Sequence, residues 1–121
     1  MSYSPVVNAF CNIQQGGVAF PYPAGWTDVI QVPNSGHVEY DIAAARTVMG
    51  LAAGQGLFII FSADAPFWAN FFANAAVPSG NTTNGTASEY APNQRYIDAT
   101  VTKISFAAPA AANVSLQFYR P

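Results

Sequence analysis

The nearest approach to a chemical site in this sequence is the set of His37, Glu39 and Asp41 at alternate positions. On a β-strand these residues share one face, with neighbours about 6.6 to 7 Å apart. Imidazole and carboxylate groups are suitable ligands for zinc or iron, but a metal site needs three or four convergent donors. The chain contains a single histidine, and alternating polar residues are typical of any half-exposed strand. We therefore expect no metal and no cofactor.

Nucleophilic catalysis would need a general base, and His37 is the one histidine that could serve. No local signature pairs it with Cys11, and a lone cysteine in an apolar alternating segment is more often a small buried hydrophobe. Acidic pairs for glycoside chemistry can be drawn in any domain with six acidic residues, so they carry no signal. A glycine-rich phosphate loop and a dinucleotide fingerprint are both absent from the sequence. We predict that the protein is not an enzyme.

Two aromatic clusters remain as candidate interaction sites. One lies on a proline-braced loop, and the other is a run in which consecutive aromatic residues could not all face one core if the segment were a strand. Tyrosine and tryptophan also dominate the binding energy of many interfaces. The alternative is that the first cluster caps the end of the fold and the second packs as a short helix. The candidate residues are Tyr22, Trp26, Phe67, Trp68, Phe71 and Phe72.

Short strands separated by proline and glycine are the elements that must position these residues. The continuous apolar run of 57–61 favours a central strand, and residues 37–42 alternate with the period of a half-buried strand. Segments 43–52 and 67–77 fit either helix or strand, and 81–92 is a long polar loop. Further strands are expected at 6–13, 18–20 and 28–32.

The C-terminal part of the chain predicts two long strands. Residues 96–106 form one strand whose inward face changes parity, which indicates a β-bulge near Thr102 and Lys103. A final strand then places Val114, Leu116 and Phe118 inward and forms an antiparallel hairpin with its predecessor.

These elements predict an all-β fold, an antiparallel β-sandwich of seven or eight short strands, with a jelly roll as one candidate topology. The length of 121 residues suits a single domain over 1–121. Residues 1–7 are expected to form an extended N-terminal arm.

Charge scarcity is the most informative feature of the composition. Charged residues make up 8% of the chain, against about 25% in ordinary soluble domains. Interface cores are depleted in charge in the same sense, so we expect an assembled state. Four basic residues cannot build a nucleic-acid-binding stripe or hold an anionic membrane surface. No apolar stretch reaches the roughly 20 residues of a membrane span, and no signal peptide is visible.

The chain resembles the small β-sandwich head decoration (cement) proteins of tailed bacteriophages. The resemblance rests on the strand at 56–61, the Thr/Asn/Gly loop and the closing pattern of 95–97, 104–106 and 114–119. It implies a structural virion protein on the outer capsid surface, with the major capsid protein as partner and a homotrimer as the favoured oligomer. It also implies contacts through the Tyr22 and Trp26 loop, the 67–72 segment and the 2–7 arm.

Two other functions remain open from the sequence. A lectin-like, carbohydrate-binding module would stack Tyr22, Trp26 or Trp68 on a sugar ring and bind its hydroxyls through Asn and Asp. A phage tail or baseplate component would have the same composition as a decoration protein.

Overall fold

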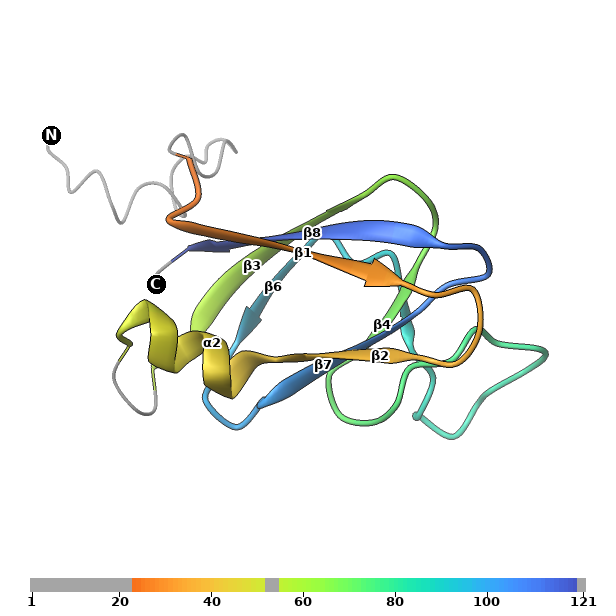
Figure 1. Ribbon diagram of the computed structural model, residues 1–121. Coiled ribbons are helices and arrows are strands. Elements are labelled where there is room, and N and C mark those ends of the chain that lie inside the picture. Colours follow the sequence, from red (N-terminus) through yellow and green to blue (C-terminus); the bar gives the residue numbers. More distant parts are fainter. Residues whose placement is uncertain (1–22, 52–54, 120–121) are drawn as a thin grey trace, which may run out of the picture.

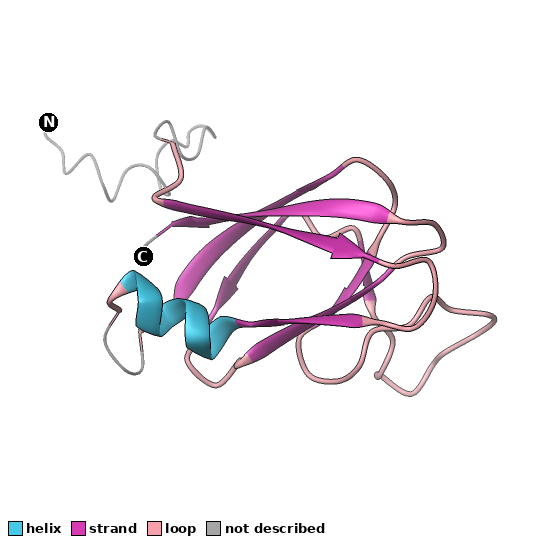
Figure 2. Ribbon diagram, in the orientation of Figure 1, coloured by secondary structure: helices cyan, strands magenta, loops and turns pink. Residues whose placement is uncertain are grey.

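Two antiparallel sheets pack face to face in the computed structural model, which describes residues 23–51 and 55–119 (Figure 1). The described residues form eight strands and one short helix, which confirms the predicted all-β sandwich (Figure 2). The strands are β1 (Trp26–Val32), β2 (Val38–Asp41), β3 (Leu57–Ala63), β4 (Trp68–Asn70), β5 (Glu89–Tyr90), β6 (Gln94–Ile97), β7 (Lys103–Ala107) and β8 (Ala112–Tyr119), and the helix is α2 (Ile42–Met49).

The pairing of the strands is that of a jelly roll. Each strand pairs antiparallel with its counterpart counted from the other end: β1 with β8, β2 with β7, β3 with β6, and β4 with β5. Two more pairings, β3 with β8 and β4 with β7, join these strand pairs into two sheets. The result is sheet A, with order β1-β8-β3-β6, and sheet B, with order β2-β7-β4-β5. Two four-stranded sheets wound in this way define the jelly-roll topology.

A single core lies between the two sheets. In β8, Val114, Leu116 and Phe118 are at most 2% exposed, as their alternation predicted. Phe61 from sheet A meets Phe106 from sheet B edge to face, with ring centroids 6.2 Å apart. Burial of each such side chain stabilises the fold by about 1.5 to 3 kcal/mol. The cross-sheet ring contacts fix how the two layers sit against each other.

Segment 43–52, which fitted either helix or strand, forms most of α2, which begins one residue earlier at Ile42. The Asp41 carboxylate accepts a hydrogen bond of 3.0 Å from the Ala44 N–H and caps the first turn. Gly50 ends the helix with φ of 75°, a left-handed conformation that glycine adopts without steric cost. The helix turns Arg46 inward, where its guanidinium donates to the carbonyl oxygens of Val101 at 3.0 Å and Asp98 at 2.6 Å. Arg46 thereby holds the turn between β6 and β7.

The single long strand predicted over 96–106 is wrong. The chain forms β6 and β7, which lie in different sheets and are joined by a turn in which the Val101 N–H bonds to the Asp98 carbonyl at 3.2 Å. The inward-facing positions change parity because the chain crosses from sheet A to sheet B between β6 and β7. The change does not arise from a β-bulge. The predicted C-terminal hairpin is also wrong, because β8 pairs with β1 and β3.

Segment 67–77 forms the three-residue strand β4 followed by irregular chain, and the polar loop 81–92 contains the short strand β5. The long loop between β4 and β5 projects from the end of the sandwich opposite α2 (Figure 1). The predicted strands at 6–13 and 18–20, the arm at 1–7, Cys11 and Tyr22 lie outside the described residues.

Polar contacts tie the two layers together at both open edges. At the edge formed by β1 and β2, the Tyr40 hydroxyl donates to the Asp28 carboxylate, which also accepts from the Trp26 indole N–H at 3.0 Å. At the edge formed by β6 and β5, Arg95 makes an ion pair with Glu89, with Nη2 and Oε1 2.6 Å apart. The Tyr40–Asp28 and Arg95–Glu89 contacts each join a residue of sheet A to a residue of sheet B.

Candidate functional site

The strands of sheet A place no charged side chain on their outer face among the residues that the structure describes. Side chains alternate along each strand, so the positions that do not enter the core form one continuous outer surface. We call this surface the neutral face. Its residues are Thr27, Val29, Gln31, Phe58, Ile60, Ser62, Gln94, Tyr96, Asn113, Ser115, Gln117 and Tyr119.

An aromatic row crosses the neutral face. The strand register places Phe58 directly opposite both Tyr119 and Tyr96. The rings of Phe58 and Tyr96 meet edge to face with centroids 5.2 Å apart. Tyr96 is 53% exposed, and Val29, on the other side of the face, is 63% exposed. The neutral face thus combines exposed apolar area with amide and hydroxyl groups that can bond to a partner.

The outer face of sheet B has the opposite character. The side chains of Glu39, Asp41 and Lys103 point outward from β2 and β7. Glu39 lies 3.4 Å from the Lys103 ammonium and 3.7 Å from the His37 imidazole. Because Asp41 is occupied as the cap of α2, the alternating set found in the sequence serves ion pairing and helix capping. Within the described residues, no three His, Cys, Asp or Glu side chains gather closely enough to hold a metal ion.

Several of the predicted interaction residues belong to the interior. Phe67 is 4% exposed and packs with Phe61 and Phe106 at centroid distances of 6.3 and 6.1 Å. Phe71 is half-buried against the same core, 6.2 Å from Phe61. Trp26 is half-buried at the end of the sandwich beside α2, where its indole bonds to Asp28. Phe67 in particular presents no surface to a partner.

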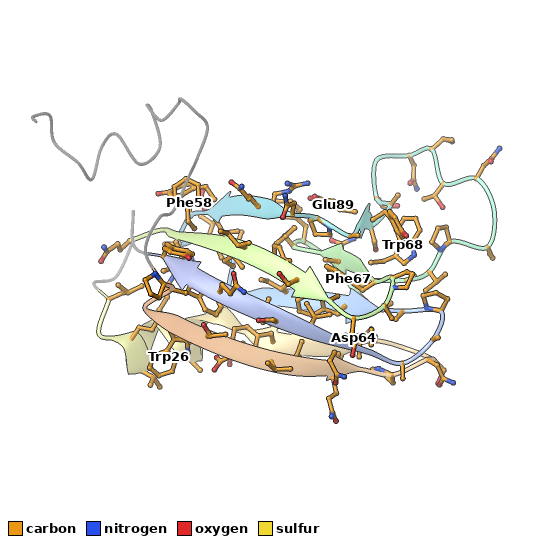
Figure 3. The ribbon with its side chains drawn as sticks, turned by 90° about the horizontal axis from the view of Figure 1, so that it is seen from above. Trp26, Phe58, Asp64, Phe67, Trp68 and Glu89 are labelled. Atoms are coloured by element: carbon orange, nitrogen blue, oxygen red, sulfur yellow. The ribbon has the colours of Figure 1, made fainter. Side chains whose placement is uncertain are left out.

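The other predicted residues lie at the surface. Trp68 is half-buried on the outer face of sheet B and packs against Tyr90, with centroids 4.9 Å apart. Phe72 is 88% exposed, more than any other large hydrophobic side chain that the structure describes. Trp26 and Trp68 lie at opposite ends of the sandwich, so they do not form one site (Figure 3). Tyr22 lies outside the described residues.

A hollow of about 350 Å³ lies beside Phe72 on the sheet B side of the molecule. The segment after β4 forms one wall, and β7 with its preceding turn forms the floor. Most of the lining is polar. The lining residues that matter for binding are Glu39, Phe72, Asn74, Thr100, Thr102 and Lys103.

The titratable groups with shifted pKa values serve the structure of the sandwich. Burial, followed by the hydrogen bond to Asp28, raises the pKa of the Tyr40 hydroxyl. Hydrogen bonds from the backbone and the side chain of Asn113 lower the pKa of Asp64, which closes the turn between β3 and β4 against β8. The pKa of Asp98 is lowered by hydrogen bonds from the Thr100 side chain and backbone. None of these groups lines the hollow, and Asp64 lies at the edge of the neutral face, where its carboxylate accepts a hydrogen bond from the Asn113 side chain.

Comparisons with protein families, with curated proteins and with solved structures found no match. In the described part of the chain, no helix has the length and apolar character needed to cross a membrane. The neutral face and the hollow are therefore the two surfaces from which a function can be argued.

The sequence interpretation missed the neutral face. Residues 57–61 form the predicted central strand, but the continuous apolar run does not indicate that Phe58 and Ile60 face outward and are half-buried. A detectable signal existed, because the alternate positions of 27–31, 94–96 and 113–119 are all uncharged. The segments could not be joined into one face without knowledge of the strand order.

Proposed function

We propose that this protein is a structural, non-enzymatic virion component, a decoration protein that binds the outer surface of a capsid through the neutral face. The observation that carries the proposal is the contrast between the two outer faces. Among the described residues, the strands of sheet A place no ionised group on their outer face, while the outer face of sheet B presents Glu39, Asp41 and Lys103. The core of a protein–protein interface is typically poor in charged residues and rich in aromatic side chains. Such a surface binds a partner without the cost of removing water from an ionised group.

The jelly-roll fold is compatible with this function, since it recurs in viral capsid proteins and in lectins. Fold alone does not decide between such functions. The breadth of a four-stranded face favours docking on a protein surface over enclosure of a small ligand. Each copy would bury a modest area on the shell, and a trimer would multiply that contact into a large avidity.

A charge placed on the neutral face tests the proposal. Val29→Lys should abolish co-sedimentation with particles built from the major capsid protein of the same genome, because a buried, unpaired ammonium is strongly unfavourable. Folding should be unaffected, since Val29 is 63% exposed. Val48→Lys is the matched control: Val48 is 66% exposed on α2 and lies off the neutral face.

The results that contradict the proposal are distinct from those that support it. A wild-type protein that does not bind capsids, or a Val29→Lys variant that binds as well as wild type, would show that the neutral face is not a capsid contact. Binding to isolated tails with no binding to heads would replace the decoration role with that of a tail or baseplate component. Light scattering on the purified protein measures whether the trimer forms.

A further inference from the structure

The hollow beside Phe72 is a second surface feature, independent of the neutral face. It lies on the charged side of the sandwich, and the residues that form it come from three separate parts of the chain: β2, the segment after β4, and β7 with its preceding turn. Its volume of about 350 Å³ falls within the range of about 300 to 1,000 Å³ typical of small-molecule sites.

Buried polar groups hold the wall of this hollow in place. The Asn70 side chain is 7% exposed, and its carbonyl oxygen accepts hydrogen bonds of 2.9 Å from the N–H groups of both Phe72 and Ala73. The Ser105 hydroxyl, 3% exposed, accepts from the Ala75 N–H at 2.8 Å. These anchors hold the backbone of Phe72 in one position although its ring is 88% exposed. A fixed backbone removes part of the entropy cost of ordering the Phe72 side chain when a ligand stacks on it.

The charges of the residues that line the hollow limit the class of ligand that it can bind. Glu39 and Lys103 lie 3.4 Å apart at the floor with opposite charges, so the lining has no net charge that would attract an anion such as phosphate. Asn74 and Thr102 add amide and hydroxyl groups that can both donate and accept hydrogen bonds. An apolar ligand would leave these polar groups without water or partners, which is unfavourable.

The remaining ligand class has hydroxyl groups on its rim and an apolar face. We infer that this hollow binds a neutral saccharide, with one pyranose ring stacked on Phe72 and its hydroxyls bonded to Asn74, Thr102 and the Glu39–Lys103 pair. The negative face of the phenyl ring attracts the positively polarised C–H groups of a pyranose. The binding does not depend on the capsid proposal, since the hollow and the neutral face share no residue.

The test is an NMR titration of the full chain with methyl glucoside, methyl galactoside and methyl mannoside, up to tens of millimolar. At least one glycoside should give saturable shifts of the amide signals of Asn74, Thr102 and Lys103. Phe72→Ala should weaken that binding about tenfold or more, because a lost stacking contact of about 1.4 kcal/mol corresponds to this factor. Its thermal unfolding should match wild type, since the ring is exposed.

Val48→Ala provides the matched control, because it also removes an exposed apolar side chain but lies on α2, away from the hollow. This variant should bind the glycoside as wild type does. No saturable shift with any of the glycosides, or equal affinity in Phe72→Ala, would overturn the assignment. Saturable binding of inorganic phosphate at Lys103 in place of the glycosides would also overturn it.

Discussion

Arg46 shows how a single charged side chain can be essential to a fold that has few of them. It is 8% exposed, and its guanidinium bonds to two backbone carbonyls of the turn that carries the chain from sheet A to sheet B. Hydrogen bonds from charged groups to buried acceptors stabilise a protein by about 1.5 to 3 kcal/mol. Arg46 therefore acts as a structural cation whose partner is the backbone.

Arg46→Met keeps the apolar stem and removes the donors. We expect the free energy of unfolding, measured by urea titration, to fall by about 2 to 3 kcal/mol because the carbonyls of Val101 and Asp98 both lose the guanidinium as a donor. Arg95→Met is the control, since Arg95 is 43% exposed and pairs with Glu89 at the surface. Its loss should cost about 1 kcal/mol or less. Equal effects of the two substitutions would contradict the role given to Arg46.

Asp64 gives the fold a defined response to acid. Its folded-state pKa lies below the usual 3.8 because the ionised carboxylate accepts hydrogen bonds from Asn113. The stabilisation from these bonds is therefore present above pH 3.8 and is lost as the pH falls through the lower, folded-state pKa. In Asp64→Asn, urea unfolding between neutral pH and about pH 3 should show a smaller loss of stability than in wild type. An unchanged acid response would contradict this account.

At the scale of elements, β3 and β6 approach each other closely at Gly56. A Cβ atom at this position would lie 2.7 Å from the Ile97 carbonyl oxygen and would also collide with the Tyr96 hydroxyl. Gly56→Ala should therefore lower the free energy of unfolding by about 1 to 3 kcal/mol, as other overpacked sites do. Gly80→Ala is the control, because nothing lies within 4 Å of its added Cβ atom. Thermal or urea unfolding of both variants measures the difference.

Strands with one buried face could be predicted from the sequence. The sheet to which each strand belongs could not be predicted. Val38 and Tyr40, like the inward residues of β8, alternate because only one side of each strand meets the core. The same local rule cannot say which sheet a strand joins. Ile97 and Ile104 therefore looked like one strand, although the Asp98-Ala99-Thr100 sequence between them makes an Asx-type turn, with the Thr100 N–H bonded to Asp98 at 2.9 Å.

The candidate surfaces were harder to predict, because each combines segments distant in sequence. Phe72 and Phe67 were both predicted interaction residues, and nothing local distinguishes the exposed Phe72 from the buried Phe67 five positions earlier. The difference arises from Asn70, which is buried and whose side chain bends the chain after β4. The neutral face depends in the same way on the order of the strands.

At the scale of the whole molecule, the jelly roll joins the ends of the described chain. β1 pairs with β8 from Trp26 opposite Phe118 to Val32 opposite Ala112, so sheet A is incomplete until nearly all of the chain has been placed. Folds dominated by such distant pairings fold slowly, because loop closure costs entropy before the contacts form. Stopped-flow refolding should take milliseconds to seconds, and completion within microseconds would contradict a dependence on β1–β8 pairing.

The two-layer architecture also determines which face a bound molecule exposes to solvent. The outer faces of its two sheets point in opposite directions. A molecule that binds a surface through one sheet must therefore expose the other sheet to solvent. A particle coated through sheet A would display Phe72 and its neighbouring hydroxyl groups over its whole exterior, at the spacing of the underlying lattice. Weak attraction for one sugar ring would then become firm adhesion to a glycan-covered surface.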